Sequence, residues 1–293
     1  MTAVVVTGAG GQLGRDLCRA DWAEATTVTG LTRAELDITD AEAVRWRLDE
    51  LAPDVIVNAA AYTAVDRAEK EPELAHRINA DAVGHLARWV DDAGARLVQI
   101  STDYVFDGEK EGWYVESDPV HPLGVYGETK AEGEARAREA ARHVILRTAW
   151  VYGALGANFV TTMRRLADER GHLRVVADQV GCPSATADLA AAIGKLVAQD
   201  PIGEAVGTFH LASPTAASWY DFARSILADA IGAGLHVEPI PTSEYPTPAA
   251  RPQNSRLASD VIQSAHGIGV RSWQDALPDV IAELDHQEAR DTP

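Results

Sequence analysis

Three glycines directly after a short hydrophobic run constrain the fold of this chain more than any other feature. Residues 4–6 are three consecutive valines, a β-branched run typical of a buried strand. Gly8, Gly11 and Gly14 follow with the spacing Gly-x-x-Gly-x-x-Gly. Residues 15–20 then have a helical pattern. A strand, a glycine-rich turn and a helix in this order are the context that a dinucleotide-binding turn requires.

Each glycine in this turn has its own role when a dinucleotide binds. The first permits the tight turn, the second lets the backbone approach a pyrophosphate, and the third lets the helix pack close to the sheet. The helix N-terminus then presents free N–H groups and a partial positive charge to the phosphates. The alternative is a tight turn without a ligand. We expect the dinucleotide to contact Gly8, Gly11, Gln12, Leu13 and Gly14.

Strands and helices are expected to alternate along the first half of the chain. The hydrophobic pattern predicts strands at 4–6, 26–31, 54–58, 96–100 and 143–147, with helices between them at 15–20, 41–51, 72–92 and 126–141. This order forms a parallel sheet through right-handed crossovers. Asn79 falls in the middle of the third helix, where it is either a surface residue or one that bends the helix beside a site. The predicted fold class is therefore α/β, a doubly wound parallel sheet of Rossmann type.

The composition limits the partners and the compartment. The 293 residues carry a formal net charge of -18, which argues against nucleic acid as a partner because phosphate binding needs Lys and Arg. No apolar run is long enough to span a bilayer, and the N-terminus lacks the basic segment of a signal peptide. Cys18 and Cys182 lie far apart without metal-ligand spacing. We expect two reduced thiols in a cytoplasmic protein that does not associate with membranes.

The carboxyl ends of the predicted strands supply further candidates for cofactor contacts. Many NAD-binding folds carry an acidic residue at the end of the second strand, but here that place holds Gly30 or Leu31, followed by Thr32 and Arg33. A hydroxyl and a guanidinium suit a 2′-phosphate, which favours NADPH over NADH; the alternative is a solvated arginine. The remaining cofactor candidates at the strand ends are Asp37, Ile38, Ala59, Ala60, Ala61, Tyr62 and Ser101.

Tyr126 and Lys130 are the candidate proton donor and its partner. They lie four residues apart, so a helix would place both side chains on one face. An ammonium near a phenol lowers the pKa of the phenol, and the tyrosine can then protonate a carbonyl oxygen near neutral pH. Thr102, after the fourth strand, offers a hydroxyl to the same oxygen. The alternatives are a half-exposed tyrosine beside a solvated lysine, and a threonine that caps a strand end.

Seven blocks of sequence, in order along nearly the whole chain, resemble the dTDP-4-dehydrorhamnose reductases. These are extended short-chain dehydrogenases of the nucleotide-sugar branch. The most specific blocks are Ser-Thr-Asp-Tyr-Val-Phe-Asp-Gly at 101–108 and Arg-Pro-Gln-Asn-Ser-Arg-Leu at 251–257. The other five blocks lie at 8–14, 58–66, 125–130, 147–153 and 178–183.

The resemblance implies the domains, the reaction and the roles of several residues. It implies a Rossmann domain over 1–150, with contributions from about 184–213, and a smaller, interleaved α/β substrate domain over 151–293. The implied reaction is NAD(P)H-dependent reduction of the 4-keto group of a dTDP-4-keto-6-deoxy sugar, namely dTDP-4-dehydro-β-L-rhamnose to dTDP-L-rhamnose. Tyr126 would donate the proton, Lys130 would lower its pKa and hold the nicotinamide ribose, and Thr102 would replace the usual serine. The residues implied near sugar or phosphate are Val65, Thr102, Asp103, Trp150, Gln179, Arg251, Asn254 and Ser255.

The sequence does not decide whether the protein binds a metal, which oligomer it forms or which exact function it has. Some family members bind a divalent cation such as Mg²⁺ at a homodimer contact through glutamates, but Asp16 stands at one such position here. No metal ligand is therefore assigned. One alternative function is a ketoreductase that acts on another dTDP-deoxysugar of an antibiotic pathway. The other is a non-catalytic, NADP-binding regulatory subunit, which would tolerate loss of Thr102, Tyr126 or Lys130.

Overall fold

A six-stranded parallel sheet forms the centre of the computed structural model, which describes residues 1–199 and 206–291. The strand order is β10-β5-β4-β3-β1-β2, and all five neighbouring pairs are parallel. Since β1 pairs with both β2 and β3, the chain changes direction across the sheet beside β1. Ligands bind at such a switch point, at the carboxyl ends of the strands. The strands are β1 (Thr2–Thr7), β2 (Thr26–Leu31), β3 (Val55–Asn58), β4 (Arg96–Thr102), β5 (His143–Thr148) and β10 (Gly207–His210).

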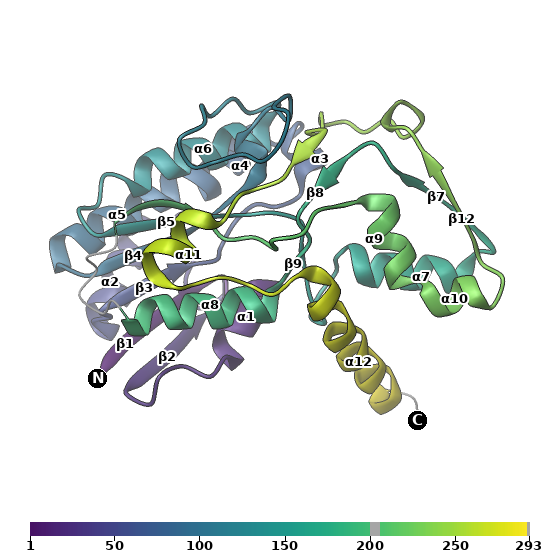
Figure 1. Cartoon of the computed structure of the whole chain (residues 1–293). Coiled ribbons are helices and arrows are strands. Elements are labelled where there is room, and N and C mark those ends of the chain that lie inside the picture. Colours follow the sequence, from purple (N-terminus) through teal and green to yellow (C-terminus); the bar gives the residue numbers. More distant parts are fainter. Residues whose placement is uncertain (200–205, 292–293) are drawn as a thin grey trace.

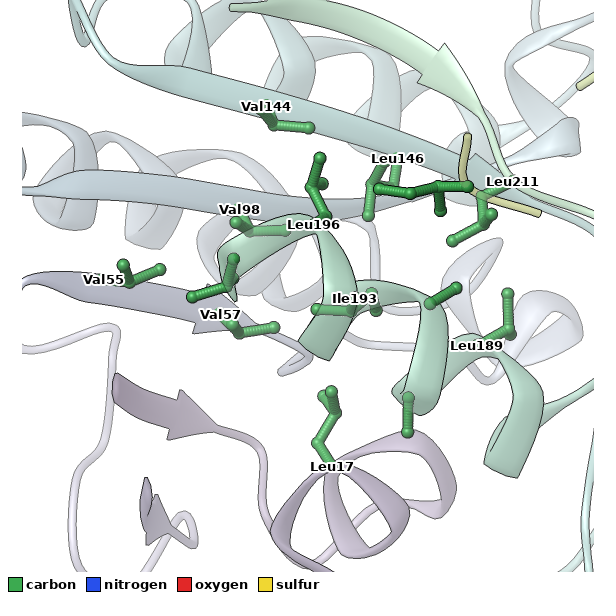
Figure 2. Packing of buried hydrophobic residues seen from close by; sticks show 14 of the residues in the cluster. Leu17, Val55, Val57, Val98, Val144, Leu146, Leu189, Ile193, Leu196 and Leu211 are labelled. Carbon is green, nitrogen blue, oxygen red and sulfur yellow. The ribbon is translucent and has the colours of Figure 1, made fainter. Parts of the chain in front are cut away.

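Helices cover both faces of this sheet (Figure 1), so the predicted α/β class of Rossmann type is confirmed. One face carries α1 (Gln12–Arg19), α8 (Thr186–Gln199) and α11 (Asp260–His266). The other carries α2 (Ala41–Leu51), α5 (Ala82–Ala93) and α6 (Val125–Ala137). Figure 2 shows Ile193 and Leu196 of α8 in one cluster with Val57, Val98 and Val144 of the sheet. Each fully buried side chain of this size stabilises the fold by about 1.5–3 kcal/mol.

A second hydrophobic core lies beside the sheet in the C-terminal half. Helices α7, α9 and α12 and the parallel pair β7–β12 build this core. Figure 1 shows these elements grouped on the side away from the N-terminal strands. The elements of this half are β6 (Val151–Tyr152), α7 (Phe159–Glu169), β7 (His172–Val176), β8 (Val180–Gly181), β9 (Ser184–Ala185), β11 (Ala217–Ser218), α9 (Trp219–Ile226), α10 (Ala228–Gly232), β12 (His236–Ile240), η3 (Thr242–Glu244), β13 (Asn254–Ser255) and α12 (Trp273–Asp291).

The chain crosses between the two cores more than once. After β9 it returns to the main sheet as α8 and β10, whose side chains belong to the first core. This return falls within the range 184–213 that was expected to join the Rossmann domain; its residues 200–205 lie outside the described residues. Within the described ranges, no helix is long and apolar enough to cross a membrane.

The third predicted helix is interrupted. It consists of α4 (Pro72–His76), a π-helical turn η1 (Arg77–Asp81) and α5. Asn79 lies in the π turn and is buried, so its interpretation as a surface residue is wrong. The Tyr62 N–H donates to Asn79 Oδ1 at 2.8 Å, and Asn79 Nδ2 donates to the Thr129 hydroxyl of α6 at 3.1 Å. The bent helix thus ties the loop after β3 to α6.

Candidate active site

The glycine-rich turn leaves no room for side chains. Gly8 has a φ of +71°, and a Cβ there would lie 2.5 Å from the Ala60 nitrogen. A Cβ on Gly14 would lie 2.1 Å from the Gly8 carbonyl oxygen. The Gly11 N–H donates to the same oxygen at 2.9 Å. Gly8 and Gly14 are therefore required by close backbone contact, whereas a Cβ on Gly11 would lie 3.3 Å from the Gly8 oxygen.

The N-terminus of α1 is suited to an anion. Among the described residues no side chain caps it, and its first turn holds no acidic residue. Its N–H groups are thus available to a pyrophosphate, and the residues present fit a dinucleotide. The Gln12 side chain is used elsewhere: Nε2 donates to the Ala157 carbonyl, and Oε1 accepts from Asn158. Leu13 packs against the first core. Both residues can offer only their backbone to the cofactor.

Carboxylates surround the residues predicted to bind a 2′-phosphate. Glu35 accepts from both the N–H and the hydroxyl of Thr32, at 2.8 and 2.7 Å. The exposed Arg33 guanidinium lies 3.7 Å from Asp37. Ile38 is buried in the core beneath them. A 2′-phosphate would therefore meet Arg33 together with two negative charges.

The loop 59–62 after β3 lies against the glycine turn. Asn58 Oδ1 accepts from the Thr7 hydroxyl at 2.6 Å and from the Ala60 N–H at 3.2 Å. The Tyr62 hydroxyl donates to Glu71 at 2.5 Å. The small residues 59–61 are partly exposed and leave this edge of the sheet accessible to a flat ligand.

Asp103 is a buried carboxylic acid at the end of β4. The Thr102 hydroxyl donates to its Oδ1 at 3.0 Å, and the Ser255 side chain lies near enough to lower its pKa. Oδ2 is buried and has no hydrogen-bond partner among the described residues. Burial raises the pKa of Asp103 to about 6. An unsatisfied buried carboxyl group at a strand end is typical of a functional site.

Ser101 does not offer its hydroxyl to the cofactor side. This hydroxyl donates to Glu134 Oε1 at 2.6 Å, and both residues are buried. Arg147 completes the cluster with two bonds to Glu134, at 2.8 and 2.7 Å. The predicted cofactor contact of Ser101 is therefore limited to its backbone.

Tyr126 and Lys130 both lie on α6, as the spacing predicts. The Thr102 side chain lies near enough to Tyr126 to lower the pKa of the phenol, and Tyr104 packs edge-on against the Tyr126 ring at 5.3 Å between centroids. The Lys130 ammonium donates to the Ile100 carbonyl at 2.6 Å. The tyrosine and threonine hydroxyls therefore meet at one point of the sheet edge.

The predicted acidification of Tyr126 is wrong for this structure. Burial raises the pKa of Tyr126 above its ordinary value, and Lys130 is not among the groups that oppose this rise. Burial also lowers the pKa of Lys130 to about 8, against the effect of the nearby Glu134. The i, i+4 spacing correctly predicts that Tyr126 and Lys130 share one face of the helix. It does not reveal that both side chains lose their contact with water, which shifts both pKa values towards the neutral forms.

Arg251 is oriented by Asp66. Its Nη2 lies 2.8 Å from Asp66 Oδ2, and its Nη1 donates to the Tyr104 hydroxyl at 3.2 Å. Val65 precedes Asp66 in the short helix α3 (Val65–Ala68). Arg251 thus lies beside Tyr104, which in turn packs on Tyr126, and Val65 is the neighbour of its ion-pair partner Asp66.

Trp150 has a strained backbone and a fixed ring. Its φ is +47°, which non-glycine residues rarely adopt. The ring stacks on Trp219 at 3.5 Å with an interplanar angle of 5°. A Cβ on Gly181 would lie 2.3 Å from Trp150 Cε2. Trp150 is partly exposed, so it is not a simple core residue.

Two predicted substrate residues have side chains that hold loops instead. Asn254 Nδ2 donates to the carbonyls of Lys110 and Gly112, both at 2.7 Å, and Oδ1 accepts from Arg256. Gln179 is buried and donates to the Thr242 hydroxyl at 3.0 Å. The structure therefore does not support a direct side-chain contact with substrate for either residue. Ser255 does reach the site through Asp103.

No metal centre can be identified in the part of the chain that the structure describes, because no three His, Cys, Asp or Glu residues there are arranged to hold an ion. Burial raises the pKa of Asp16, and Thr186 beside it opposes this rise. Glu283 lies near enough to contribute to that rise.

The sequence patterns did not indicate Tyr104, Glu134 and Arg147 as site residues. Glu134 follows Lys130 at the i, i+4 spacing, and Arg147 interrupts the apolar run of β5. A charged residue inside a buried parallel strand needs a partner, and this signal could have identified the pair.

A Rossmann sheet with a glycine turn at its switch point, and a tyrosine and a lysine one helical turn apart at its carboxyl edge, defines an extended short-chain dehydrogenase. Comparison with known proteins then gives the family. The chain belongs to the dTDP-4-dehydrorhamnose reductase family: the family model described as "RmlD substrate binding domain" matches residues 1–286. The resemblance drawn from the seven sequence blocks is confirmed.

Relatives and solved structures agree over nearly the whole length. The dTDP-4-dehydrorhamnose reductase of Aggregatibacter actinomycetemcomitans is 43% identical over 291 residues, which cover 96% of this chain and 99% of the relative. The spore coat polysaccharide biosynthesis protein SpsK of Bacillus subtilis is 41% identical, with 97% and 98% covered. The dTDP-4-dehydrorhamnose reductase structure from Clostridium acetobutylicum superposes with a TM-score of 0.91 at 40% identity, covering 97% and 99%. The Bacillus anthracis enzyme in complex with NADP also gives 0.91, at 37% identity, covering 96% and 99%.

Proposed function

We propose that this chain reduces the 4-keto group of dTDP-4-dehydro-β-L-rhamnose to give dTDP-L-rhamnose, with NAD(P)H as the reductant. The observation that carries the proposal is the meeting of the Thr102 and Tyr126 hydroxyls at the carboxyl edge of the sheet. Two hydroxyls at one point suit a carbonyl oxygen on which negative charge develops, provided that the Thr102 proton turns from Asp103 to that oxygen. The names of the relatives supply the substrate class.

The proton transfer follows from the protonation state of Tyr126. Its raised pKa keeps the phenol neutral at physiological pH, so it carries the proton that the product oxygen needs. Bound NAD(P)H would supply the hydride to the ketone carbon, with its pyrophosphate on the turn from Gly8 to Gly14. Tyr126 then gives its proton to the oxygen and regains one from solvent. We assign Lys130, one turn along the same helix, to the ribose and to this proton return.

On the substrate side we assign direct contacts to Val65, Asp103, Trp150, Arg251 and Ser255. Arg251 is a fixed donor, since Asp66 already holds one of its nitrogens. A guanidinium oriented in this way suits the planar oxygens of a diphosphate. Trp150 has a strained backbone and is partly exposed, so we assign it an apolar contact with the sugar or the base.

NADPH is the proposed cofactor, and NADH is the alternative. Arg33 favours the 2′-phosphate, while Asp37 and Glu35 beside it oppose a further negative charge. The Bacillus anthracis relative was solved with NADP. The ratio of kcat/KM for NADPH to that for NADH decides the preference, and Arg33→Ala should lower this ratio if the guanidinium contacts the phosphate.

The substitution Tyr126→Phe tests the proposed reaction. It removes the proton donor and keeps the ring, so kcat with dTDP-4-dehydro-β-L-rhamnose should fall by about 10²-fold or more while NADPH binding is retained. Tyr245→Phe, at an exposed tyrosine, is the matched control. Full activity of Tyr126→Phe would refute the mechanism. Faster turnover of another dTDP-4-ketosugar would favour a ketoreductase of a different pathway, and absence of NADPH oxidation together with a copurifying enzyme would favour a regulatory subunit.

A further inference from the structure

The N-terminus of α6 is capped by a side chain from a distant part of the sequence. The N-cap residue is Gly124, which has no side chain of its own to make the bond. Instead, the Val125 N–H donates to Glu69 Oε1 at 3.0 Å. The fit is tight, because a Cβ at position 124 would lie 2.6 Å from the same oxygen. A helix N-terminus has unsatisfied N–H groups and favours negative charge, so Glu69 meets both needs directly before Tyr126.

The segment that carries Glu69 is fixed on both sides. Before it, Asp66 forms an ion pair with Arg251 at 2.8 Å. After it, Glu71 accepts from the Tyr62 hydroxyl at 2.5 Å. Three acidic residues of one short segment thus reach three different parts of the site: the substrate-side loop, the first turn of α6 and the loop after β3. Glu69 itself is partly buried, which shields its bond from water.

Apart from the cap, the first turn of α6 is held by the packing of Tyr104 on the Tyr126 ring and by the close approach of Gly127 to the Tyr104 carbonyl. Leu123 is exposed, and Val125 and Tyr126 are only partly buried. The next turn differs, because Thr129 and Lys130 are buried and the Lys130 ammonium is held by the Ile100 carbonyl. Loss of the cap would therefore loosen the turn that carries Tyr126 and leave the turn that carries Lys130 in place.

We propose that Glu69 is a positioning residue that holds the Tyr126 hydroxyl beside Thr102 by capping α6. The inference rests on the proposed reduction, in which Tyr126 donates the proton. Since the role depends on a hydrogen bond at a set distance, an acceptor of the same length should replace the carboxylate. A shorter side chain should not, even when it keeps the charge.

Four variants test this role: Glu69→Ala, Glu69→Asp, Glu69→Gln and, as the matched control, Glu73→Ala at an exposed glutamate of α4. Loss of a helix cap predicts that kcat falls about tenfold in the Ala and Asp variants. The Gln variant and the control should keep wild-type kcat. The NADPH dissociation constant, measured by fluorescence of the bound nicotinamide, should be unchanged in all four.

Amide hydrogen exchange provides a readout that does not depend on turnover. Exchange in a peptide that covers residues 124–128 should be faster in the Ala and Asp variants and unchanged in the Gln variant. The proposal is overturned if the Ala variant keeps wild-type kcat and exchange, if Asp preserves them while Gln does not, or if all three variants lose kcat and NADPH affinity together. If the wild-type protein reduces no dTDP-4-ketosugar, the proposed function fails, and the exchange data still decide whether Glu69 caps the helix.

Discussion

Asp103 is predicted to destabilise the protein at neutral pH. It is 3% exposed, its Oδ2 has no partner among the described residues, and burial raises its pKa from 3.8 to about 6. At about 1.36 kcal/mol per pH unit, this difference corresponds to a cost of about 3 kcal/mol for the ionised form. The substitution Asp103→Asn removes the charge and keeps an oxygen that can accept from Thr102.

The sign of the pH dependence follows from proton binding. Between pH 3.8 and about pH 6 the folded protein keeps the Asp103 proton, whereas the unfolded chain has lost it. The free energy of unfolding of the wild type therefore falls as the pH rises through this window. The Asn variant lacks this dependence. Its amide nitrogen has no partner and costs about 1–3 kcal/mol, but that cost does not change with pH.

Urea unfolding of both proteins at a series of pH values tests this reasoning. We expect the stability of Asp103→Asn relative to the wild type to increase by about 2 kcal/mol between pH 4 and pH 7.5, the part of the cost that titrates within this range. The sequence pI is about 4.8, so samples near that pH are avoided. A stability difference that stays constant across the series would refute the burial argument.

Three further predictions concern substitutions of Glu134, Gly14 and Lys130. Glu134→Gln leaves the buried Arg147 without a full counter-charge and should lower the free energy of unfolding by about 3–5 kcal/mol; a urea midpoint close to that of the wild type would contradict this. Gly14→Ala places a Cβ 2.1 Å from the Gly8 oxygen, so NADPH should bind at least about tenfold more weakly by fluorescence titration, and unchanged affinity would show that the turn can relax. Because burial lowers the pKa of Lys130 from 10.5 to about 8, the unfolded chain binds more protons between these values. The wild type should therefore gain about 2 kcal/mol over Lys130→Met from pH 7.5 to 9.5, and parallel stability curves would exclude this.

Local patterns predicted the first half of the fold well. The bounds 26–31 and 41–51 agree with β2 and α2. The helix begins there because the Asp40 side chain accepts from the N–H groups of residues 42 and 43, a contact that neighbouring residues alone determine. Within the glycine turn the contacts of Gly11 and Gly14 with Gly8 are equally local, whereas Gly8 itself meets Ala60 after β3.

Contacts between distant residues were not predictable in the same way. Glu69 and Val125 are 56 positions apart, and nothing in either local pattern indicates their bond. The π turn around Asn79 forms because that side chain bonds Tyr62 and Thr129, which belong to other elements. The sequence blocks predicted substrate contacts for Arg251 and Asn254 alike. In the structure Arg251 can contact a ligand, whereas the Asn254 side chain holds a loop.

The titration of the site also depends on burial, which sequence spacing does not reveal. Burial shifts Asp103, Tyr126 and Lys130 in the same sense, towards their neutral forms. Negative charge that develops on a substrate oxygen would therefore meet fixed hydroxyl donors in a poorly solvated site, where such donors stabilise charge most strongly. The same poor solvation imposes the cost that Asp103 carries at neutral pH. If Asp103 contacts substrate, Asp103→Asn should be the more stable protein at pH 7.5 and the less active one, because the buried charge would be retained for function at the expense of stability. A variant with both full turnover and higher stability would show that the carboxylate has no part in the reaction.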